Sequence, residues 1–278
     1  MHSNEATKQW IRRCVGVLLG VSFAVTAPLL NGRTPLPPQP NAGRGLEPLG
    51  ASISFEPNLG QAEERVKFMA RGPGYTLSLT QQGVVLSFQQ PESRAGSEVF
   101  HSLALKFMGA SRVTKLAAKD ELTTTSSYFL GADPTKWRTG IPNFGSVTIE
   151  NVYPGIDVMY HGTHGRLQCS FLVAVGAQPS RITIAISGAK NPRLDSEGNL
   201  IFGSANTELR LHKPTAHQDA GANKRPVSAK YLVRSGRILF ALTDYDGTKT
   251  LTIDPVLSYE RYLRTEDSVR SQNVERHE

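Results

Sequence analysis

Apolar and polar residues alternate with a period of two over most of this chain, and this pattern constrains its fold more than any other feature. The alternation recurs from Ile53 onward in short runs bounded by Gly, Pro, Asn or Asp. Clear runs occupy residues 103–107, 156–160, 182–186 and 227–233. Successive side chains of a β-strand point to opposite faces, so the pattern predicts strands with one buried face. We find no amphipathic stripe that would indicate a long helix.

Turn-forming residues separate these runs. Residues 81–83, Gln-Gln-Gly, predict a hairpin between strands over 75–79 and 84–88. Two short helical turns are expected, one after Asn58 and one at 133–136. In the second, Asp133 can cap the turn and Pro134 can take its first position.

Many short antiparallel strands predict an all-β fold. They can form sheets packed face to face, as in a sandwich, or a sheet that partly closes on itself. The candidate strands exceed what one simple sandwich needs, so two β-lobes divided near residues 111–125 are the alternative arrangement. An immunoglobulin-type domain is not expected, because its paired cysteines around a core Trp are missing.

The N-terminus has the order of an export signal. Lys8, Arg12 and Arg13 precede an uncharged apolar run over 15–25, and small residues follow at 25–27. The alternatives are cleavage after 22–24 or an uncleaved anchor that extends to Leu30. The expected division is 1–27 signal peptide or anchor, 28–50 Pro/Gly-rich linker, 51–259 β-rich domain and 260–278 charged tail.

Cysteine usage fits an exported protein without disulfides. Cys14 would leave with the signal, and Cys169 would remain alone. Alternation places Cys169 on the same strand face as Leu167 and Phe171, which predicts a small buried apolar residue. A reactive thiolate would need a nearby cation or a helix N-terminus, and the surrounding sequence offers neither.

Composition and motifs exclude several classes of function. The net charge of +7 comes from Lys and Arg dispersed along the chain without interleaved aromatic residues, so nucleic-acid binding is not expected. The sequence has no Gly-x-Ser-x-Gly elbow, phosphate loop or dinucleotide fingerprint. The pairs His161/His164 and His212/His217 and the turn at 244–247 supply too few ligands for a metal. We therefore expect no cofactor and no metal.

Seven motifs, in this order, resemble the N-terminal domain of bacterial β-propeller-repeat (SBBP-repeat) proteins. They occupy residues 55–61, 70–77, 128–131, 133–139, 152–157, 211–214 and 253–257. The resemblance covers residues 53–259. It implies a β-rich exported domain that stands before propeller repeats, and it supplies no catalytic residues. The chain departs from the pattern after Tyr259, where a charged tail replaces the repeats, so the domain works alone or the reading frame is truncated. It departs also at Cys169-Ser170, where the family has an aromatic and an acidic residue.

These observations favour a non-catalytic exported β-domain that acts as a structural or interaction module at the cell surface or in the periplasm. Its partner would be a protein or a polysaccharide, and only an uncleaved N-terminal segment would contact the membrane. The alternatives are a carbohydrate- or peptide-binding module and a hydrolase with a carboxylate pair drawn from Glu56, Asp157 and Asp254.

Trp137, Arg138 and Tyr153 are the candidate residues of a ligand platform. The other interpretation is that Trp137 is a core residue between lobes. Pro134 and Pro142 bracket its segment, which cannot form a long strand or helix and therefore needs an anchor. We expect on this basis that Trp137 packs into the body and that Arg138 binds a carboxylate or backbone carbonyls.

Overall fold

The computed structural model describes residues 53–72, 74–88, 102–112, 114–129, 131–163, 166–189, 192–204, 207–220 and 223–261. The expected signal peptide, the linker and nearly all of the charged tail lie outside these residues. The all-β prediction is confirmed, because strands account for 65% and helices for 3% of the structure. Within the described part of the chain, no helix has the length and apolar character needed to cross a membrane.

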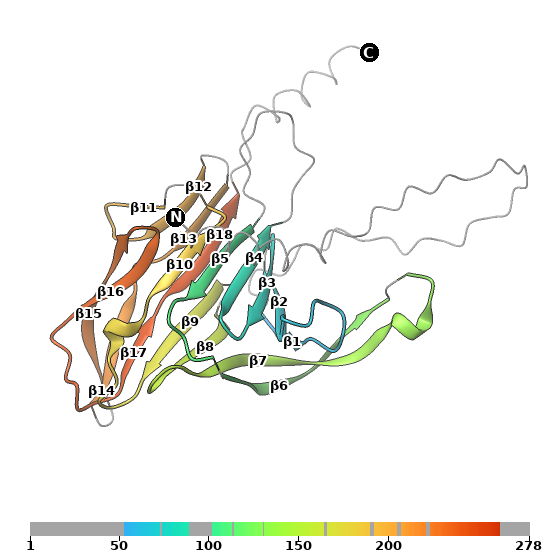
Figure 1. The fold of residues 1–278 in the computed structure, drawn as a ribbon, viewed down its shortest axis with the longest axis horizontal. Coiled ribbons are helices and arrows are strands. Elements are labelled where there is room, and N and C mark those ends of the chain that lie inside the picture. The colour runs from blue at the N-terminus through green and yellow to red at the C-terminus, as the bar shows by residue number, and fades with distance from the viewer. Residues whose placement is uncertain are drawn as a thin grey trace, which may run out of the picture.

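The strands lie in two layers that belong to one large antiparallel sheet (Figure 1). The first layer holds β1 (Phe55–Pro57), β2 (Phe68–Gly72), β3 (Tyr75–Thr80), β4 (Gly83–Phe88), β5 (Ser102–Phe107), β10 (Ile184–Ser187), β16 (Arg237–Thr243) and β15 (Asn223–Arg234). The second holds β6 (Lys115–Tyr128), β7 (Arg138–Tyr153), β8 (Ile156–Thr163), β9 (Arg166–Val173), β11 (Arg193–Leu194), β12 (Leu200–Ser204), β13 (Thr207–Leu211), β14 (Thr215–Ala220), β17 (Leu251–Asp254) and β18 (Val256–Arg261).

Strand pairing joins the two layers into a closed circuit among the described strands. The circuit runs β1-β2-β3-β4-β5-β10-β16-β15-β14-β17-β9-β8-β7 and returns to β1, where Phe55 pairs with Phe144. A branch leaves it at β9 and runs β18-β13-β12-β11. Pro255 separates β17 from β18, because proline has no N–H to donate to a ladder. Both strands pair with β9 on one edge, whereas the other edge pairs first with β14 and then with β13.

The space between the layers is filled by the inward faces of the strands. One apolar cluster joins side chains from Ile53 to Leu257. Phe171 on β9 forms edge-to-face contacts with Phe107 on β5 and Phe240 on β16, at centroid distances of 5.9 and 5.4 Å. These contacts join the two layers at the centre of the core. The division into two lobes near residues 111–125 stays a prediction.

The two expected helical turns have different outcomes. A 3₁₀ turn, η1 (Pro134–Lys136), follows Asp133, whose Oδ1 accepts a hydrogen bond from the Thr135 N–H at 3.0 Å. This capped turn was predicted. The other prediction was wrong, because the residues after Asn58 form a loop of bends and turns. A further 3₁₀ turn, η2 (Pro179–Arg181), precedes β10.

The outer halves of β6 and β7 leave the body as a two-stranded projection (Figure 1). We call residues 121–144 the arm, with its tip at 129–137. Asp120, just before the arm, has a left-handed backbone with φ of 60°, and its Oδ2 accepts a hydrogen bond from Ser146 Oγ. Gly145 lies opposite, where an added Cβ would be 3.1 Å from the Asp120 Cβ. The absence of a side chain at Gly145 therefore lets the bend form.

Candidate functional site

Two aromatic side chains are exposed at the tip of the arm. Phe129 is 64% exposed and Trp137 is 38% exposed, and their rings meet edge to face at 5.2 Å with an interplanar angle of 84°. The Trp137 Nε1–H donates a hydrogen bond to the Gly131 carbonyl at 3.1 Å. This bond fixes the indole, so the pair has a defined geometry without a hydrophobic core beneath it.

Exposed apolar side chains are frequent on the arm and on the loop beside it. Eight large apolar residues are exposed in the described part of the chain, and four of them lie on the arm or on the loop beside it. The four are Leu59, Leu122, Phe129 and Trp137. Single exposed apolar residues are ordinary on a protein surface, whereas a local group of them marks a candidate contact surface.

Hydrogen bonds of Arg138 attach one side of the tip to the body. Its Nε donates to the Leu59 carbonyl at 3.0 Å, and its Nη1 donates to the carbonyls of Thr135 and Trp137 at 3.0 and 2.9 Å. The expectation that Arg138 binds backbone carbonyls is confirmed. The three bonds join the end of η1, the start of β7 and the loop after β1.

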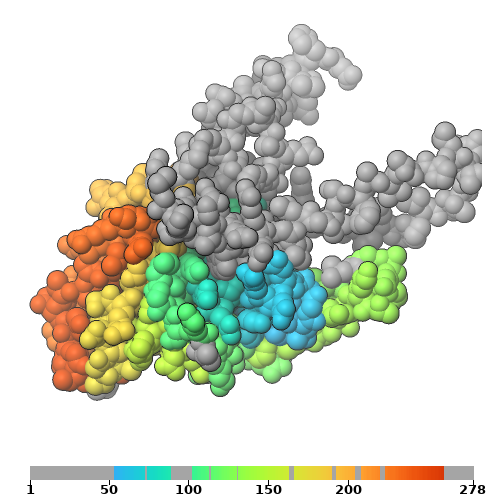
Figure 2. Space-filling model, viewed as in Figure 1, coloured from blue at the N-terminus to red at the C-terminus, as the bar shows by residue number. Residues whose placement is uncertain are grey.

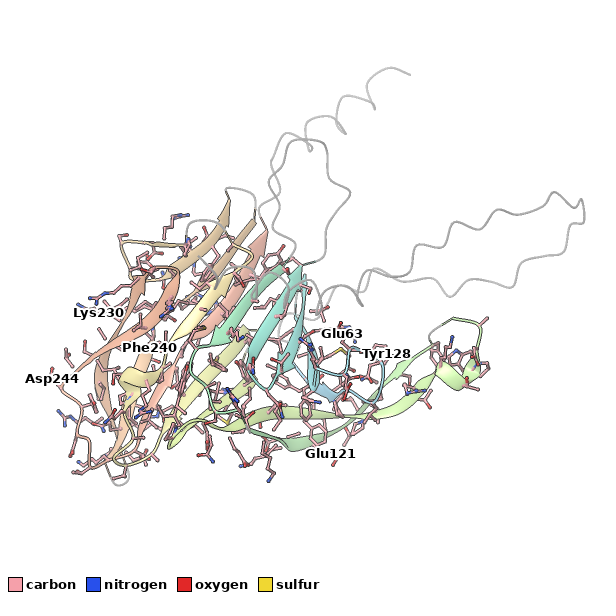
Figure 3. All side chains as sticks on the ribbon, in the orientation of Figure 1. Glu63, Glu121, Tyr128, Lys230, Phe240 and Asp244 are labelled. Carbon is pink, nitrogen blue, oxygen red and sulfur yellow. The ribbon has the colours of Figure 1, made fainter. Side chains whose placement is uncertain are left out.

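Hydrogen bonds of Tyr128 attach the other side of the tip to the body. Its hydroxyl donates a hydrogen bond to the carboxylate of Glu56, and it accepts one from Arg71 Nη2 at 2.7 Å. Arg71 Nη1 lies 3.5 Å from the Glu56 carboxylate, and its guanidinium stands 5.2 Å from the centre of the Tyr128 ring. Tyr128, labelled in Figure 3, and Arg138 are register partners, so the two attachments lie side by side at the start of the tip.

The loop that receives Arg138 is held in place by Asn58. Its Nδ2 donates to the carbonyls of Ala62, Glu63 and Val66 at 3.1, 2.8 and 2.8 Å. Its Oδ1 accepts from the N–H groups of Gly60 and Ala62. One side chain therefore satisfies five backbone groups of the loop, which places the Leu59 carbonyl where Arg138 can reach it.

Four of the seven sequence motifs converge on this site. The segment 55–61 supplies Glu56, Asn58 and Leu59, and 70–77 supplies Arg71. The segments 128–131 and 133–139 supply both the attachments and the tip itself. Pairs of strands that are distant in the sequence bring these pieces together, and no local pattern reveals that they meet.

The Tyr128 hydroxyl acts as a constant hydrogen-bond donor in this attachment. Burial, followed by the hydrogen bond with Glu56, raises the pKa of Tyr128 to about 12, so its hydroxyl stays protonated and remains a donor. The carboxylate of Glu56 is buried and has both Tyr128 and Arg71 as partners. Through these two partners the buried Glu56 carboxylate holds the arm to the body.

The structure separates the predicted platform residues. Trp137 and Arg138 lie together at the tip, whereas Tyr153 lies at the other end of β7 and is buried, with its hydroxyl bonded to the Thr183 carbonyl at 3.0 Å. The expectation that Trp137 packs into the body was wrong. The arm projects from the body of the sheet (Figure 1), and among the described residues the ring contact of the indole is Phe129, so Trp137 stays 38% exposed. Phe129 was not among the predicted platform residues, although it directly follows Tyr128 in the motif at 128–131.

The three candidate carboxylates are held by separate partners. Glu56 belongs to the arm attachment, and Asp157 Oδ1 accepts from the Asn151 N–H at 2.7 Å. Asp254 accepts hydrogen bonds from Ser170 and Gln168, and His217 Nδ1 lies 3.5 Å from its Oδ2. In this last group the carboxylate stands between Ser170 and His217, whereas a nucleophilic triad needs the imidazole in that middle place.

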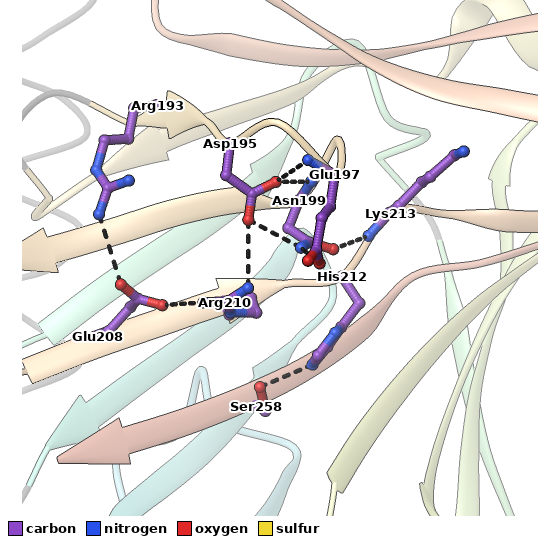
Figure 4. Close-up of polar contacts among 9 residues, drawn as sticks. All are labelled: Arg193, Asp195, Glu197, Asn199, Glu208, Arg210, His212, Lys213 and Ser258. Atoms are coloured by element: carbon purple, nitrogen blue, oxygen red, sulfur yellow. Dashed lines mark hydrogen bonds and ion pairs between the residues drawn. The ribbon is translucent and has the colours of Figure 1, made fainter. Parts of the chain in front are cut away.

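A second polar network surrounds the turn between β11 and β12 (Figure 4). Asp195 accepts from the N–H groups of Glu197 and Asn199 and from the side chains of Asn199 and Arg210. Arg210 also pairs with Glu208 at 2.7 Å. These bonds stabilise a tight turn. Within the described residues, no three His, Cys, Asp or Glu side chains are grouped to hold a metal ion.

Cys169 lies on the inner face of β9, as predicted, beside Tyr160, and it is partly rather than fully buried. Burial raises the pKa of its thiol to about 12. It borders a cavity of about 30 Å³ lined by apolar side chains of both layers. Ligand pockets usually measure about 300–1,000 Å³, so this space is an ordinary packing void.

Comparison with known proteins gives one match. A family model described as Domain of unknown function (DUF7948) matches residues 55–256, which is most of the chain and includes every residue of the arm. No curated protein and no solved structure matches the chain.

Proposed function

We propose an interaction role for this chain, which belongs to the family of the Domain of unknown function (DUF7948). It is an exported, non-catalytic β-domain that works at the cell surface or in the periplasm, and the tip of its arm is the binding element. The tip carries two exposed aromatic side chains on a projection that the protein body holds in a fixed position.

The observation that carries this proposal is the double attachment of the tip. A two-stranded projection is only marginally stable by itself. Here Tyr128 and Arg138, the register partners that flank the tip, each bind the body, and between them Phe129 and Trp137 remain exposed. Fixing aromatic side chains before a partner arrives lowers the entropy cost of binding, and Trp is among the residues most enriched at the centre of interfaces.

The geometry of the pair favours a protein partner with an apolar pocket. The two rings meet at 84°, so the tip presents a ridge, and a ridge that projects from the surface fits a recess. A polysaccharide would instead need a flat ring face along which sugars could lie. The peptide- and carbohydrate-binding alternatives therefore become outcomes of the test.

Two further parts of the proposal rest on sequence. Export is supported by the succession of basic, apolar and small residues before residue 28. The finer relationship, to the N-terminal domain of SBBP-repeat proteins, is supported by the order of the seven motifs. N-terminal sequencing of the exported protein should give a first residue between about 25 and 28, the cleavage range that signal-peptide rules indicate.

The test of the binding role is photo-crosslinking in the source cells. A benzophenone amino acid replaces Phe129 in the whole chain, and a matched variant carries it at Tyr245, which is 40% exposed on the loop between β16 and β17. We expect a discrete adduct from position 129 that is lost when Trp137→Ala is added. An adduct that stains for carbohydrate and resists protease would favour the polysaccharide alternative. Equal crosslinking from 129 and 245 would remove the tip as the binding element.

A further inference from the structure

The structure collects positive charge on one face of the first layer. Four strands that are neighbours in the sheet, β5, β10, β16 and β15, contain no Asp and no Glu, and neither does η2. In Figure 2 these elements form one continuous surface, in the order orange (β15, β16), yellow (β10) and green (β5). We call five cations of this surface the basic face: Lys106, Arg181, Lys230, Arg234 and Arg237. Lys224 and Arg225, at the other end of β15, are not included, since Lys224 pairs with Asp219 in register and Arg225 donates to the Asp244 carbonyl.

Strand register places these cations side by side. Arg234 pairs with Arg237 across the hairpin whose turn, Ser235-Gly236, has positive φ at both residues. Arg237 pairs with Ala185, and Ala185 pairs on its other side with Lys106. Three cations therefore stand in one row across four strands, and neighbouring strands are about 4.8 Å apart.

The remaining members extend the row along the strands. Lys230 lies on β15 four residues before Arg234, and Arg181 ends the η2 turn that leads into β10. Alternation directs Lys230 and Arg234 outward, because Val227, Ala229 and Tyr231 on β15 are buried while Lys230 and Arg234 are exposed. Arg181 is exposed at the end of its turn. Figure 3 shows Lys230 on the outer side of this layer and Phe240 within it.

These positive charges have no counterion in the described part of the protein. None of the five residues takes part in an ion pair there. Like charges directly opposite on neighbouring strands destabilise a sheet, and Arg234 faces Arg237 in that way. An anionic partner would relieve this repulsion.

The face also carries an apolar pair at its centre. Leu232, which is 36% exposed, pairs with Leu239 between the Lys230 row and the Arg234 row. Tyr231 and Phe240, the nearest aromatic residues, are buried in the core and leave no ring on the outer side for a base or a sugar to stack on. Cations around an exposed leucine and a half-buried one suit a surface that is anionic at its headgroups and apolar beneath them.

We propose that the basic face docks the domain on a membrane surface rich in anionic lipid. This contact is independent of the arm, which leaves the molecule from β6 and β7. It is also independent of the N-terminal apolar run, because its residues lie on β5, β10, β15, β16 and η2 or between them.

The test is flotation of the whole chain with vesicles of phosphatidylcholine mixed with phosphatidylglycerol, and with vesicles of phosphatidylcholine alone. We expect binding to the mixed vesicles that falls steeply as salt rises, since charges near a surface are screened within about 10 Å at 0.1 M. Each cation removed should weaken binding about fivefold, so Arg234→Gln with Arg237→Gln should weaken it about 25-fold. Leu232→Ser should weaken it further, and Leu194→Ser, at another exposed leucine, should not.

The matched control is Lys119→Gln with Arg166→Gln, which removes the same charge from exposed positions on the second layer. Every variant keeps residues 15–25, so insertion of the apolar run would be common to all and insensitive to salt. The proposal fails if the two double variants bind alike, or if phosphatidylcholine alone binds equally well. It fails also if a soluble sulfated polysaccharide or a DNA duplex binds the face more tightly than the vesicles do.

Discussion

The hydroxyl of Tyr128 donates a hydrogen bond to the buried carboxylate of Glu56, which lies 72 positions earlier in the chain. This contact fixes the far end of β6, which pairs only with β7 among the described strands, to the first strand of the sheet. This contact is one of the two attachments of the arm, and it joins two segments that are distant in the sequence.

Replacing Tyr128 by Phe should destabilise the protein. The change leaves the ring beside the Arg71 guanidinium but removes the hydroxyl, which donates to the buried Glu56 carboxylate and accepts from Arg71 Nη2. Loss of a hydrogen bond to a charged group usually costs about 1.5–3 kcal/mol. Urea unfolding of the full chain measures the loss. Tyr245→Phe is the matched control, because that exposed tyrosine is expected to change the free energy of unfolding by less than about 0.5 kcal/mol. Equal midpoints for the two variants would contradict the proposed attachment.

Stability should fall steeply at alkaline pH. Burial raises the pKa of Tyr75 and Tyr128 from 10.0 to about 12, and that of Cys169 from 9.0 to about 12. The unfolded chain releases these protons at lower pH than the folded chain does. The contribution is therefore complete below about pH 9, and it is lost as pH rises from there toward 12.

Urea midpoints measured between about pH 8 and 12 test this alkaline loss. Cys169→Ala should remove the earliest part of the fall, which begins near the ordinary thiol pKa, and leave the part due to the tyrosines. A midpoint that stays level through pH 11 would contradict the burial of these groups.

Substituting Trp137 by Ala should leave the fold nearly as stable as before. The side chain is 38% exposed, and changes at such surface positions usually alter stability by about 0.5 kcal/mol or less. Phe171→Ala, at a residue with 0% exposure, should cost about 3–5 kcal/mol and serves as the comparison.

Fluorescence reports on the tip directly. The chain has two tryptophans, at positions 10 and 137, so Trp10→Phe leaves the tip indole as the sole emitter. We expect red-shifted emission that acrylamide quenches readily in the native state. Blue-shifted, protected emission would restore the interpretation of Trp137 as a core residue.

Cys169 should react slowly with thiol reagents in the native protein. Its pKa of about 12 keeps the thiolate scarce at neutral pH, and the side chain faces the core. In a Cys14→Ser background, labelling should require denaturant, whereas Ser127→Cys on the exposed arm should label at once. Rapid native labelling of Cys169 would contradict its inward placement.

Local sequence was sufficient for the class of fold and for several details. The period of two predicts strands because side-chain direction in a strand is a property of successive residues. The same reasoning placed Cys169 inward, and the chemistry of Asp133 and Pro134 predicted the capped turn of η1. Each of these features depends on neighbours within a few positions.

Only the tertiary structure determines which side chains are exposed and which of them lie together on the surface. The prolines on either side of Trp137 favoured the prediction that its side chain is buried. Burial of a side chain, however, depends on which residues pack against it, and the arm extends beyond the sheet. Glu56, Arg71 and Tyr128 meet because β1, β2 and the end of β6 are neighbours in space. Lys106 and Arg237 are dispersed in the sequence and join one row only through the register of β5, β10 and β16. Periodicity fixes which face of a strand is buried, whereas the order and register of strands arise from long-range pairing that the local pattern does not encode.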